Sequence, residues 1–211
     1  MDMNKFELCK GFFAEDLSDK IINKINGVSY HSNKDVKLSD LSYLQVMYVD
    51  FSGNVQKGEM ICEKKLAKEL LQIFKELFDI KYPIEKIRLV DEYDADDEKS
   101  MGDNNSSCFN YRVVADTNVV SMHGYGRAVD INPLYNPYIV GDKVMPSNGK
   151  PYADRNKNFA YKIDENDRCY KIFRSHGWLW GGHWTSSKDY QHFYKPFGKV
   201  RKAIIRIKKA L

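Results

Sequence analysis

The sequence has no run of apolar residues approaching the roughly 18 that a membrane-spanning helix needs. Its first six residues, MDMNKF, include an aspartate at position 2 and no apolar stretch, so we predict neither a signal peptide nor a transmembrane segment. There are four cysteines and no CxxC pair, which argues against a zinc finger and against a dense disulfide framework. We therefore expect mostly buried or free thiols at Cys9, Cys62, Cys108 and Cys169.

Composition and charge are those of an ordinary globular protein. The 211 residues fit one domain with a sizeable core, and the chain is 43% hydrophobic and 29% charged. No repeat, low-complexity segment or linker rich in proline, glycine and serine divides it. A net charge of +4 and an isoelectric point near 8.7 give a mildly basic surface. Such a surface favours an anionic polymer as partner without identifying one.

Hydrophobic periodicity predicts the helices. Apolar residues recur at helical spacing over residues 15–25 and, most clearly, over residues 63–78. A third helix is expected over residues 165–176, ending at Gly177. The last residues, 199–211, place apolar residues on one helical face and basic residues mostly elsewhere. This pattern favours a terminal helix docked on the domain over a helix that binds a membrane or a polymer.

Strand signals lie between these helices. Residues 43–49 predict a strand that returns through the turn Ser52-Gly53-Asn54 into a second strand. Residues 94–107 are acidic and then rich in asparagine and serine, and we expect a long loop there. Further extended segments are expected over residues 87–90, 109–114, 128–131 and 191–194. The mixture predicts an α+β fold, with helices packed on a mostly antiparallel sheet.

Two of the five histidines have neighbours that suit a metal site. His123 and Asp130 lie seven positions apart in the sequence, and a turn at Gly124 and Gly126 can bring them together. Asp130 also enters an apolar strand, where a carboxylate is costly unless a partner such as a divalent metal pairs with it. His192 likewise leads into an apolar stretch. Two histidines and one carboxylate leave a fourth coordination position open, as in catalytic zinc sites.

The other histidines have simpler explanations. His31 lies among polar residues and is expected at the surface, and His176 lies in the last turn of a predicted helix, where a cation complements the helix dipole. His183 follows two glycines and precedes Trp184, so it stays a candidate for contact near the site. Asp189 lies three residues before His192, close enough to touch water on a metal without being a ligand.

Several ordered motifs together resemble one enzyme family. The segment Ser121-x-His123-x-x-Gly126-x-Ala128-x-Asp130 resembles the SxHxxGxAxD signature of the zinc D-alanyl-D-alanine peptidases, which include carboxypeptidases, dipeptidases and phage L-alanyl-D-glutamate endolysins. The resemblance covers about residues 41–193 and favours the carboxypeptidase and endolysin branch. It extends to the segments Asn104-Asn105-Ser106-Ser107, Phe109-Asn110-Tyr111-Arg112, Ile131-Asn132-Pro133, Asn136-Pro137-Tyr138, Trp178-x-Trp180-Gly181-Gly182-x-Trp184 and Asp189-Tyr190-Gln191-His192-Phe193.

The resemblance implies roles for individual residues. His123, Asp130 and His192 would bind one zinc ion, with Asp189 as general base. Arg112 would contact the substrate carbonyl or carboxylate. As substrate-binding residues we expect Ser121, which otherwise shapes the turn, together with Tyr125, Trp180 and His183. The family base is often glutamate, and Tyr194 stands where a glutamate often follows; these departures leave substrate preference open.

The resemblance also implies the fold, which is like that of hedgehog signalling domains, and together with the helical periodicity at the two ends of the chain it gives a domain layout. Residues 1–40 would be an N-terminal helical extension packed on a catalytic domain of residues 41–198, followed by the basic amphipathic helix of residues 199–211. That helix is a candidate contact for an anionic wall polymer. A nucleic-acid partner is not expected, since it would rest on these C-terminal charges alone.

The predicted function is hydrolysis of the peptide stem of bacterial peptidoglycan. Either a terminal D-alanyl-D-alanine bond or an internal L-alanyl-D-glutamate bond fits the sequence. Such a protein would act at the cell wall, reached by secretion, in the periplasm or by phage delivery. The alternative is a zinc-bearing binding module of the hedgehog type without peptidase action, and an intact candidate base at Asp189 argues against it.

Overall fold

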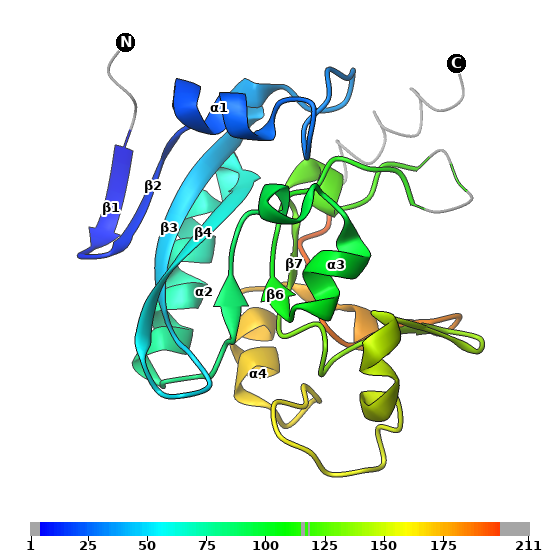
Figure 1. The fold of residues 1–211 in the computed structure, drawn as a ribbon. Helices are drawn as coiled ribbons and strands as arrows, with labels where there is room; N and C mark the ends of the chain where they lie inside the picture. Colours follow the sequence, from blue (N-terminus) through cyan, green and yellow to red (C-terminus); the bar gives the residue numbers. More distant parts are fainter. Residues whose placement is uncertain (1–4, 115–116, 118, 199–211) are drawn as a thin grey trace.

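A four-stranded antiparallel sheet forms one side of the molecule in the computed structural model, which describes residues 5–114, 117 and 119–198 (Figure 1). Its strands are β1 (Lys5–Cys9), β2 (Phe12–Asp16), β3 (Leu41–Val49) and β4 (Val55–Glu63), in that order across the sheet. β3 and β4 pair along their whole length, from Leu41 opposite Glu63 to Val49 opposite Val55. The predicted hairpin is therefore confirmed.

The helix α2 (Ala67–Asp79) covers one face of this sheet (Figure 1). It follows a short 3₁₀ turn, Lys64–Leu66, and buries an apolar stripe in the main core. The helix predicted over residues 63–78 is confirmed. The buried stripe consists of Ala67, Leu70, Leu71, Ile73, Phe74 and Leu77.

The N-terminal segment corrects the expectation of a purely helical extension. Residues 5–16 form β1 and β2, and β2 pairs with β3 from Phe13 opposite Gln45 to Asp16 opposite Ser42. Phe12 and Ala14 are buried on alternate positions, which is the burial pattern of a strand. Within the described part of this segment, α1 (Asp19–Ile25) is the one α-helix, and the Ser18 hydroxyl caps its first turn. The expected helix over residues 15–25 therefore begins four residues later than predicted.

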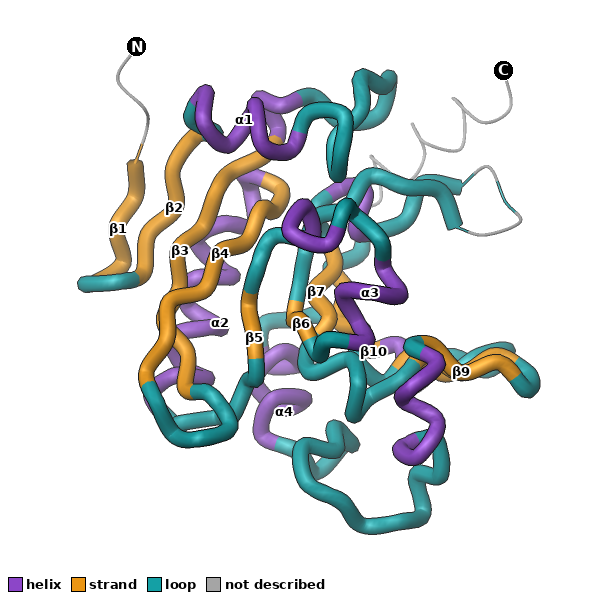
Figure 2. Tube along the Cα trace, viewed as in Figure 1, coloured by secondary structure: helices purple, strands orange, loops and turns teal. Residues whose placement is uncertain are grey.

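Short strands joined by long loops lie in the other half of the molecule (Figure 2). Most of these strands pair antiparallel. One three-stranded sheet has the order β10 (Leu179–Trp180), β12 (His192–Tyr194), β7 (Ala128–Asp130). A second has the order β11 (Lys188–Asp189), β8 (Tyr138–Val140), β9 (Lys143–Met145). β5 (Lys86–Ile87) and β6 (Asn105–Ser106) form a parallel pair. The fold is α+β and mostly antiparallel, as predicted.

The segment expected to be a loop over residues 94–107 contains the helix α3 (Asp97–Gly102) and the strand β6. The carboxylate of Asp96 accepts from the backbone N–H of Lys99 at 3.0 Å, so an acidic residue that suggested a loop is a helix cap. Two predicted strands are longer than the strands in the structure. The strand predicted over residues 87–90 ends at Ile87, and residues 109–114 form no strand beyond one bridge from Val113 to Val120.

The helix α4 (Arg168–Ser175) is capped by Asp167 and ends before Gly177, which has a φ of +73°. Phe173 stacks on Phe193 of β12 with ring centroids 4.3 Å apart, so α4 supports the strand that carries His192. Besides the 3₁₀ turn Lys64–Leu66, the described residues form the 3₁₀ turns η1 (Leu38–Asp40), η3 (Val90–Tyr93), η4 (His123–Tyr125), η5 (Ser147–Tyr152) and η6 (Gly181–His183).

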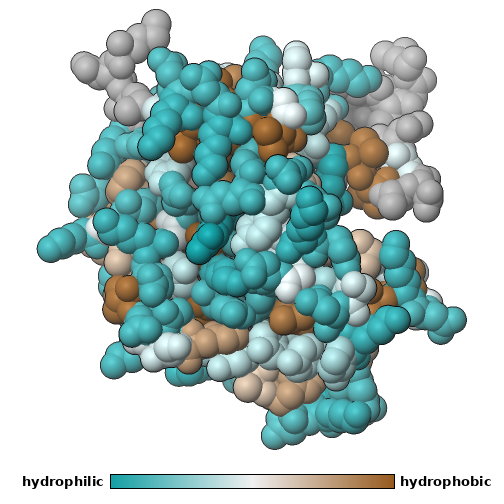
Figure 3. All heavy atoms as spheres, in the orientation of Figure 1, coloured by the Kyte–Doolittle hydropathy of each residue, from teal (hydrophilic) through white to brown (hydrophobic). Residues whose placement is uncertain are grey.

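The cysteines agree with the expectation of mostly buried or free thiols. On the face seen in Figure 3, apolar side chains gather in small separate groups among hydrophilic ones. None of the helices among the described residues is long and apolar enough to cross a membrane. All four cysteines are free thiols, and Cys62, Cys108 and Cys169 are buried. The basic helix predicted over residues 199–211 lies outside the described residues.

Candidate metal centre

Gly126 sets the turn that carries His123 towards Asp130. Its φ of +64° suits glycine, and a Cβ there would lie 2.5 Å from the backbone nitrogen of Glu63 and 2.7 Å from the carbonyl carbon of Cys62. The Glu63 N–H donates to the Gly126 carbonyl at 2.9 Å, so the turn is seated directly on the end of β4. No side chain larger than hydrogen fits there without moving backbone.

Strand pairing places Asp130 beside His192. The two residues are register partners across β7 and β12. On the other side, Asp130 and Ser107 exchange backbone hydrogen bonds of 2.9 and 3.1 Å. The carboxylate therefore projects from a strand position that is fixed from both sides, although the three residues come from distant parts of the sequence.

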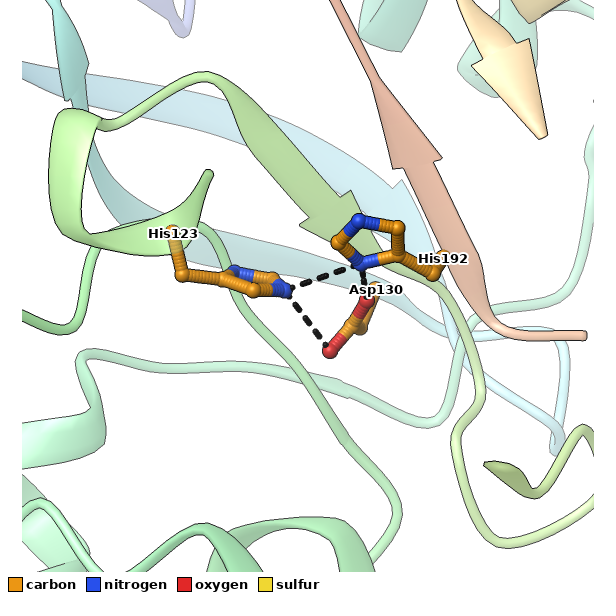
Figure 4. Close-up of side chains that lie close together, drawn as sticks. All are labelled: His123, Asp130 and His192. Atoms are coloured by element: carbon orange, nitrogen blue, oxygen red, sulfur yellow. Dashed lines mark hydrogen bonds and ion pairs between the residues drawn. The ribbon is translucent and has the colours of Figure 1, made fainter. Parts of the chain in front are cut away.

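The side chains of His123, Asp130 and His192 point towards one another in a buried cluster (Figure 4). His123 Nε2 lies 3.1 Å from His192 Nδ1 and 3.2 Å from Asp130 Oδ2, and His192 Nδ1 lies 3.0 Å from Asp130 Oδ1. In a tetrahedral zinc site with bonds of about 2.0–2.1 Å, neighbouring ligand atoms are about 3.3–3.4 Å apart. The cluster can therefore hold one metal ion after movements of a few tenths of an ångström.

The backbone of Cys108 fixes the orientation of His123. The His123 Nδ1 atom lies 2.6 Å from the Cys108 carbonyl oxygen, which can only accept, so Nδ1 carries the proton. In the neutral ring this leaves the lone pair on Nε2, the atom that faces Asp130 and His192. Hydrogen bonding of the remote ring nitrogen is the usual support of a metal-binding histidine.

The charges of the cluster also suit a metal. Burial disfavours the charged form of Asp130, yet its two histidine partners outweigh burial and hold the pKa of the carboxyl far below its usual range. Burial likewise opposes charge on His123, but the neighbouring carboxylate raises its pKa. For His192 burial prevails, and the pKa is lowered. Asp130 is thus a carboxylate at neutral pH, the form that binds metal.

Asp189 lies next to this cluster but is not one of its converging ligands. Its Oδ1 atom is buried and has no hydrogen-bond partner among the described residues. Burial raises the pKa of this carboxyl well above its usual value, and the charge of Asp130 raises it further. A Cβ on Gly181 would lie 2.8 Å from the Asp189 Cβ and 3.3 Å from the His192 Cβ, so the glycine lets these two residues approach.

Arg112 lines a small pocket beside the cluster. The Arg112 carbonyl accepts from the Ser121 N–H at 2.9 Å, which holds the arginine next to the segment that carries His123. Its Nε atom forms an ion pair with Asp97 of α3, a residue that sequence reasoning missed because it treated the whole acidic segment as a loop. The pocket is lined by Asp97, Ser100, Met101, Ser107, Asn110, Arg112, His123 and Asp130.

The remaining candidates lie in different surroundings. Ser121 is buried, and its hydroxyl accepts from the His123 N–H at 3.3 Å, so it shapes the turn. Tyr125 and Trp180 are buried in the two apolar clusters. His183 is exposed and pairs with Glu165 at 2.9 Å, outside the metal cluster. Substrate contact by these four residues stays a prediction.

The two histidines that sequence analysis set aside also lie apart from the cluster. His31 is exposed, as expected. His176 is the C-cap residue of α4, where its ring pairs with Glu76 at 2.8 Å.

One comparison with known proteins found a match. Residues 115–195 match a family model described as D-alanyl-D-alanine carboxypeptidase, so this part of the chain is a domain of that family. The matched range contains His123, Asp130 and His192 as well as Asp189, whereas Arg112 lies just before it. No curated protein and no solved structure is detectably similar to the chain.

Proposed function

We propose that this domain of the D-alanyl-D-alanine carboxypeptidase family is a zinc-dependent peptidase that hydrolyses the peptide stem of bacterial peptidoglycan. The observation that carries the proposal is the buried cluster of His123, Asp130 and His192, whose ligand atoms all lie within 4.8 Å of one another. The family match adds the substrate class, since peptides of the cell wall are the substrates that the family implies.

The donor set fits zinc. Two imidazole nitrogens and one carboxylate oxygen are a typical ligand set for catalytic zinc, and they leave a coordination position open. When bound there, zinc would act as a Lewis acid on the scissile carbonyl and would lower the pKa of water to about 7. The hydrogen bond from His123 to the Cys108 carbonyl and the backbone hydrogen bonds between Asp130 and Ser107 fix the positions of these ligands.

Asp189 is the proposed general base. Its carboxylate would take a proton from the attacking water and pass that proton to the leaving amine. Two features support this role: the buried Oδ1 atom, which has no hydrogen-bond partner in the described part of the chain, and the pKa raised by burial, which makes the carboxylate a stronger base. Because Gly181 has no Cβ, Asp189 and His192 can both pack closely against it.

Arg112 is proposed to stabilise the oxygen of the scissile carbonyl as negative charge develops there. It lines the pocket shared with His123 and Asp130, so its guanidinium lies on the side from which a substrate would approach the cluster. Removing one such donor typically lowers kcat about 100- to 1,000-fold. The site of action would be the cell wall, and Ser121, Tyr125, Trp180 and His183 remain proposed substrate contacts.

The decisive experiment combines metal analysis with a peptide digest. Purified protein loaded with zinc is incubated with a stem pentapeptide, and the products are identified by mass spectrometry. We expect one zinc per chain and cleavage at a single bond, and loss of both in His192→Ala. His31→Ala removes an exposed histidine and should change neither. One zinc per chain without cleavage of any stem peptide would instead indicate a zinc-bearing binding module, and absence of zinc binding would end the proposal.

A further inference from the structure

The ion pair between Arg112 and Asp97 bears on which substrates the pocket accepts. Arg112 Nε contacts Asp97 Oδ2, and both side chains line the pocket that also contains His123 and Asp130. The side chains keep 39% and 29% of their exposure, so both can be reached by a bound peptide. The positive charge beside the metal cluster is therefore already matched by a protein carboxylate.

Asp97 is held in this place by a second contact. The Asn110 side chain donates to Asp97 Oδ1 at 2.8 Å and to the Ala95 carbonyl at 3.1 Å. Both carboxylate oxygens of Asp97 are thus engaged, one by Asn110 and one by Arg112. The Asn110 N–H also donates to the His123 carbonyl at 3.3 Å, which connects this arrangement to the metal cluster. These contacts hold the Asp97 carboxylate in a fixed position in the wall of the pocket.

Charge then distinguishes two kinds of substrate. A residue with a free carboxylate would bring a second anion beside Asp97, and two like charges a few ångströms apart disfavour each other. A residue whose carboxyl is an amide would bring a neutral group to the same place, without that repulsion. The two kinds differ by one unit of charge at nearly the same shape.

We propose that Asp97 is a specificity-determining residue that makes this site prefer an amide over a free carboxylate on the residue following the scissile bond. The inference rests on the proposed peptidase function. It narrows the substrate class to peptides whose leaving residue is amidated or continues into a further peptide bond. Cleavage that releases a free terminal amino acid is then the disfavoured reaction.

The test uses matched pairs of peptides. One pair is a stem pentapeptide with a C-terminal carboxylate and the same peptide with a C-terminal carboxamide. The other pair carries D-glutamate or D-isoglutamine at the second position. The quantity compared is the ratio of kcat/KM for the amide over that for the carboxylate, measured with zinc-loaded protein on the pair that is cleaved.

Variants of Asp97 separate charge from shape. In the wild type we expect kcat/KM for the amide to exceed that for the carboxylate about tenfold. The substitution Asp97→Asn should lower this ratio about tenfold, mainly by lowering KM for the carboxylate. Asp97→Glu keeps the charge and should keep the preference. Asp94→Asn is the matched control, because it removes one charge near α3 from a side chain that is 88% exposed and outside the pocket; it should leave the ratio unchanged.

The possible results separate the role of Asp97 from the proposed peptidase function. A wild-type preference for the carboxylate, or a ratio that does not change in Asp97→Asn, would overturn the inference while leaving the peptidase proposal intact. Absence of cleavage in both pairs would overturn the peptidase proposal, and this inference would fall with it. A ratio that collapses equally in Asp94→Asn would show a general effect of net charge and would also overturn the assignment to Asp97.

Discussion

Arg127 and Glu63 form a buried ion pair that joins the last residue of β4 to the residue just before β7. Arg127 Nε also donates to the Lys195 carbonyl at 2.9 Å, and Nη2 donates to the Pro196 carbonyl at 3.0 Å. One guanidinium thus connects the four-stranded sheet, the strand that carries Asp130 and the chain just beyond the strand that carries His192. It fixes both ligand strands to the same support.

Replacing Arg127 with methionine should therefore weaken both folding and metal binding. Loss of one partner of a buried ion pair costs about 3–5 kcal/mol, because the other charge is left without compensation. Urea unfolding of the metal-free protein measures this loss, and a zinc competition assay measures the affinity. Lys75→Met breaks an exposed pair with Asp79 and should cost less than about 1 kcal/mol. Equal losses in the two variants would contradict a special role for Arg127.

Gly126 should tolerate no side chain, and Gly53 provides a matched control. Both have positive φ values, +64° and +82°, so alanine at either position carries the backbone penalty of about 1–2 kcal/mol. Only at Gly126 would the new Cβ also meet backbone atoms, at 2.5 Å from Glu63 nitrogen, whereas at Gly53 nothing lies within 4 Å. In the same denaturant titration, we expect Gly126→Ala to lower the free energy of unfolding clearly more than Gly53→Ala does. Gly126→Ala should also lower the affinity for zinc. Similar losses would show that backbone conformation alone matters.

Asp189→Asn should separate catalysis from metal binding. Asparagine has nearly the same shape but cannot accept the proton, so kcat should fall about 100- to 10,000-fold while one zinc per chain remains bound. Burial and the charge of Asp130 disfavour a carboxylate at this position. The free energy of unfolding of the metal-free variant at pH 7 should therefore be no lower than that of the metal-free wild type. Turnover at the wild-type rate would show that another group acts as the base.

Zinc should stabilise the fold through the cluster of His123, Asp130 and His192. A ligand at about 1,000 times its dissociation constant adds about 4 kcal/mol when only the native state binds it. In a protein of this size that corresponds to a rise in Tm of about 10 °C. Differential scanning calorimetry with zinc and with a chelator measures the difference. Asp130→Ala should abolish the shift, and a shift that persists in this variant would place the metal elsewhere.

The sequence was most informative where one local pattern decides the structure. The hairpin of β3 and β4 and the apolar stripe of α2 were predicted because turn residues and helical spacing are local signals. The meeting of His123 with Asp130 followed from a glycine turn and from a charged residue in an apolar strand. These signals need no knowledge of distant partners.

Other parts depend on contacts that sequence spacing does not reveal. β2 becomes a strand by pairing with β3, some 30 residues further along, and β1 in turn pairs with β2. Short apolar runs do not distinguish that outcome from a helix. α3 is six residues long, too short for periodicity, and is defined by its cap at Asp96. The pairing of Asp97 with Arg112 likewise requires α3 to be placed against the metal cluster, which only the tertiary fold provides.

The strand that carries His192 is only three residues long, and its partner strand is equally short. Because side chains alternate between the two faces of a strand, a slip by one residue would turn His192 away from Asp130 and bring Gln191 or Phe193 opposite it. An ion bound by residues of both strands opposes such a slip. A bound metal would then fix the register of β7 and β12. The protein would thus align these two strands correctly in the same step in which it assembles its reactive centre.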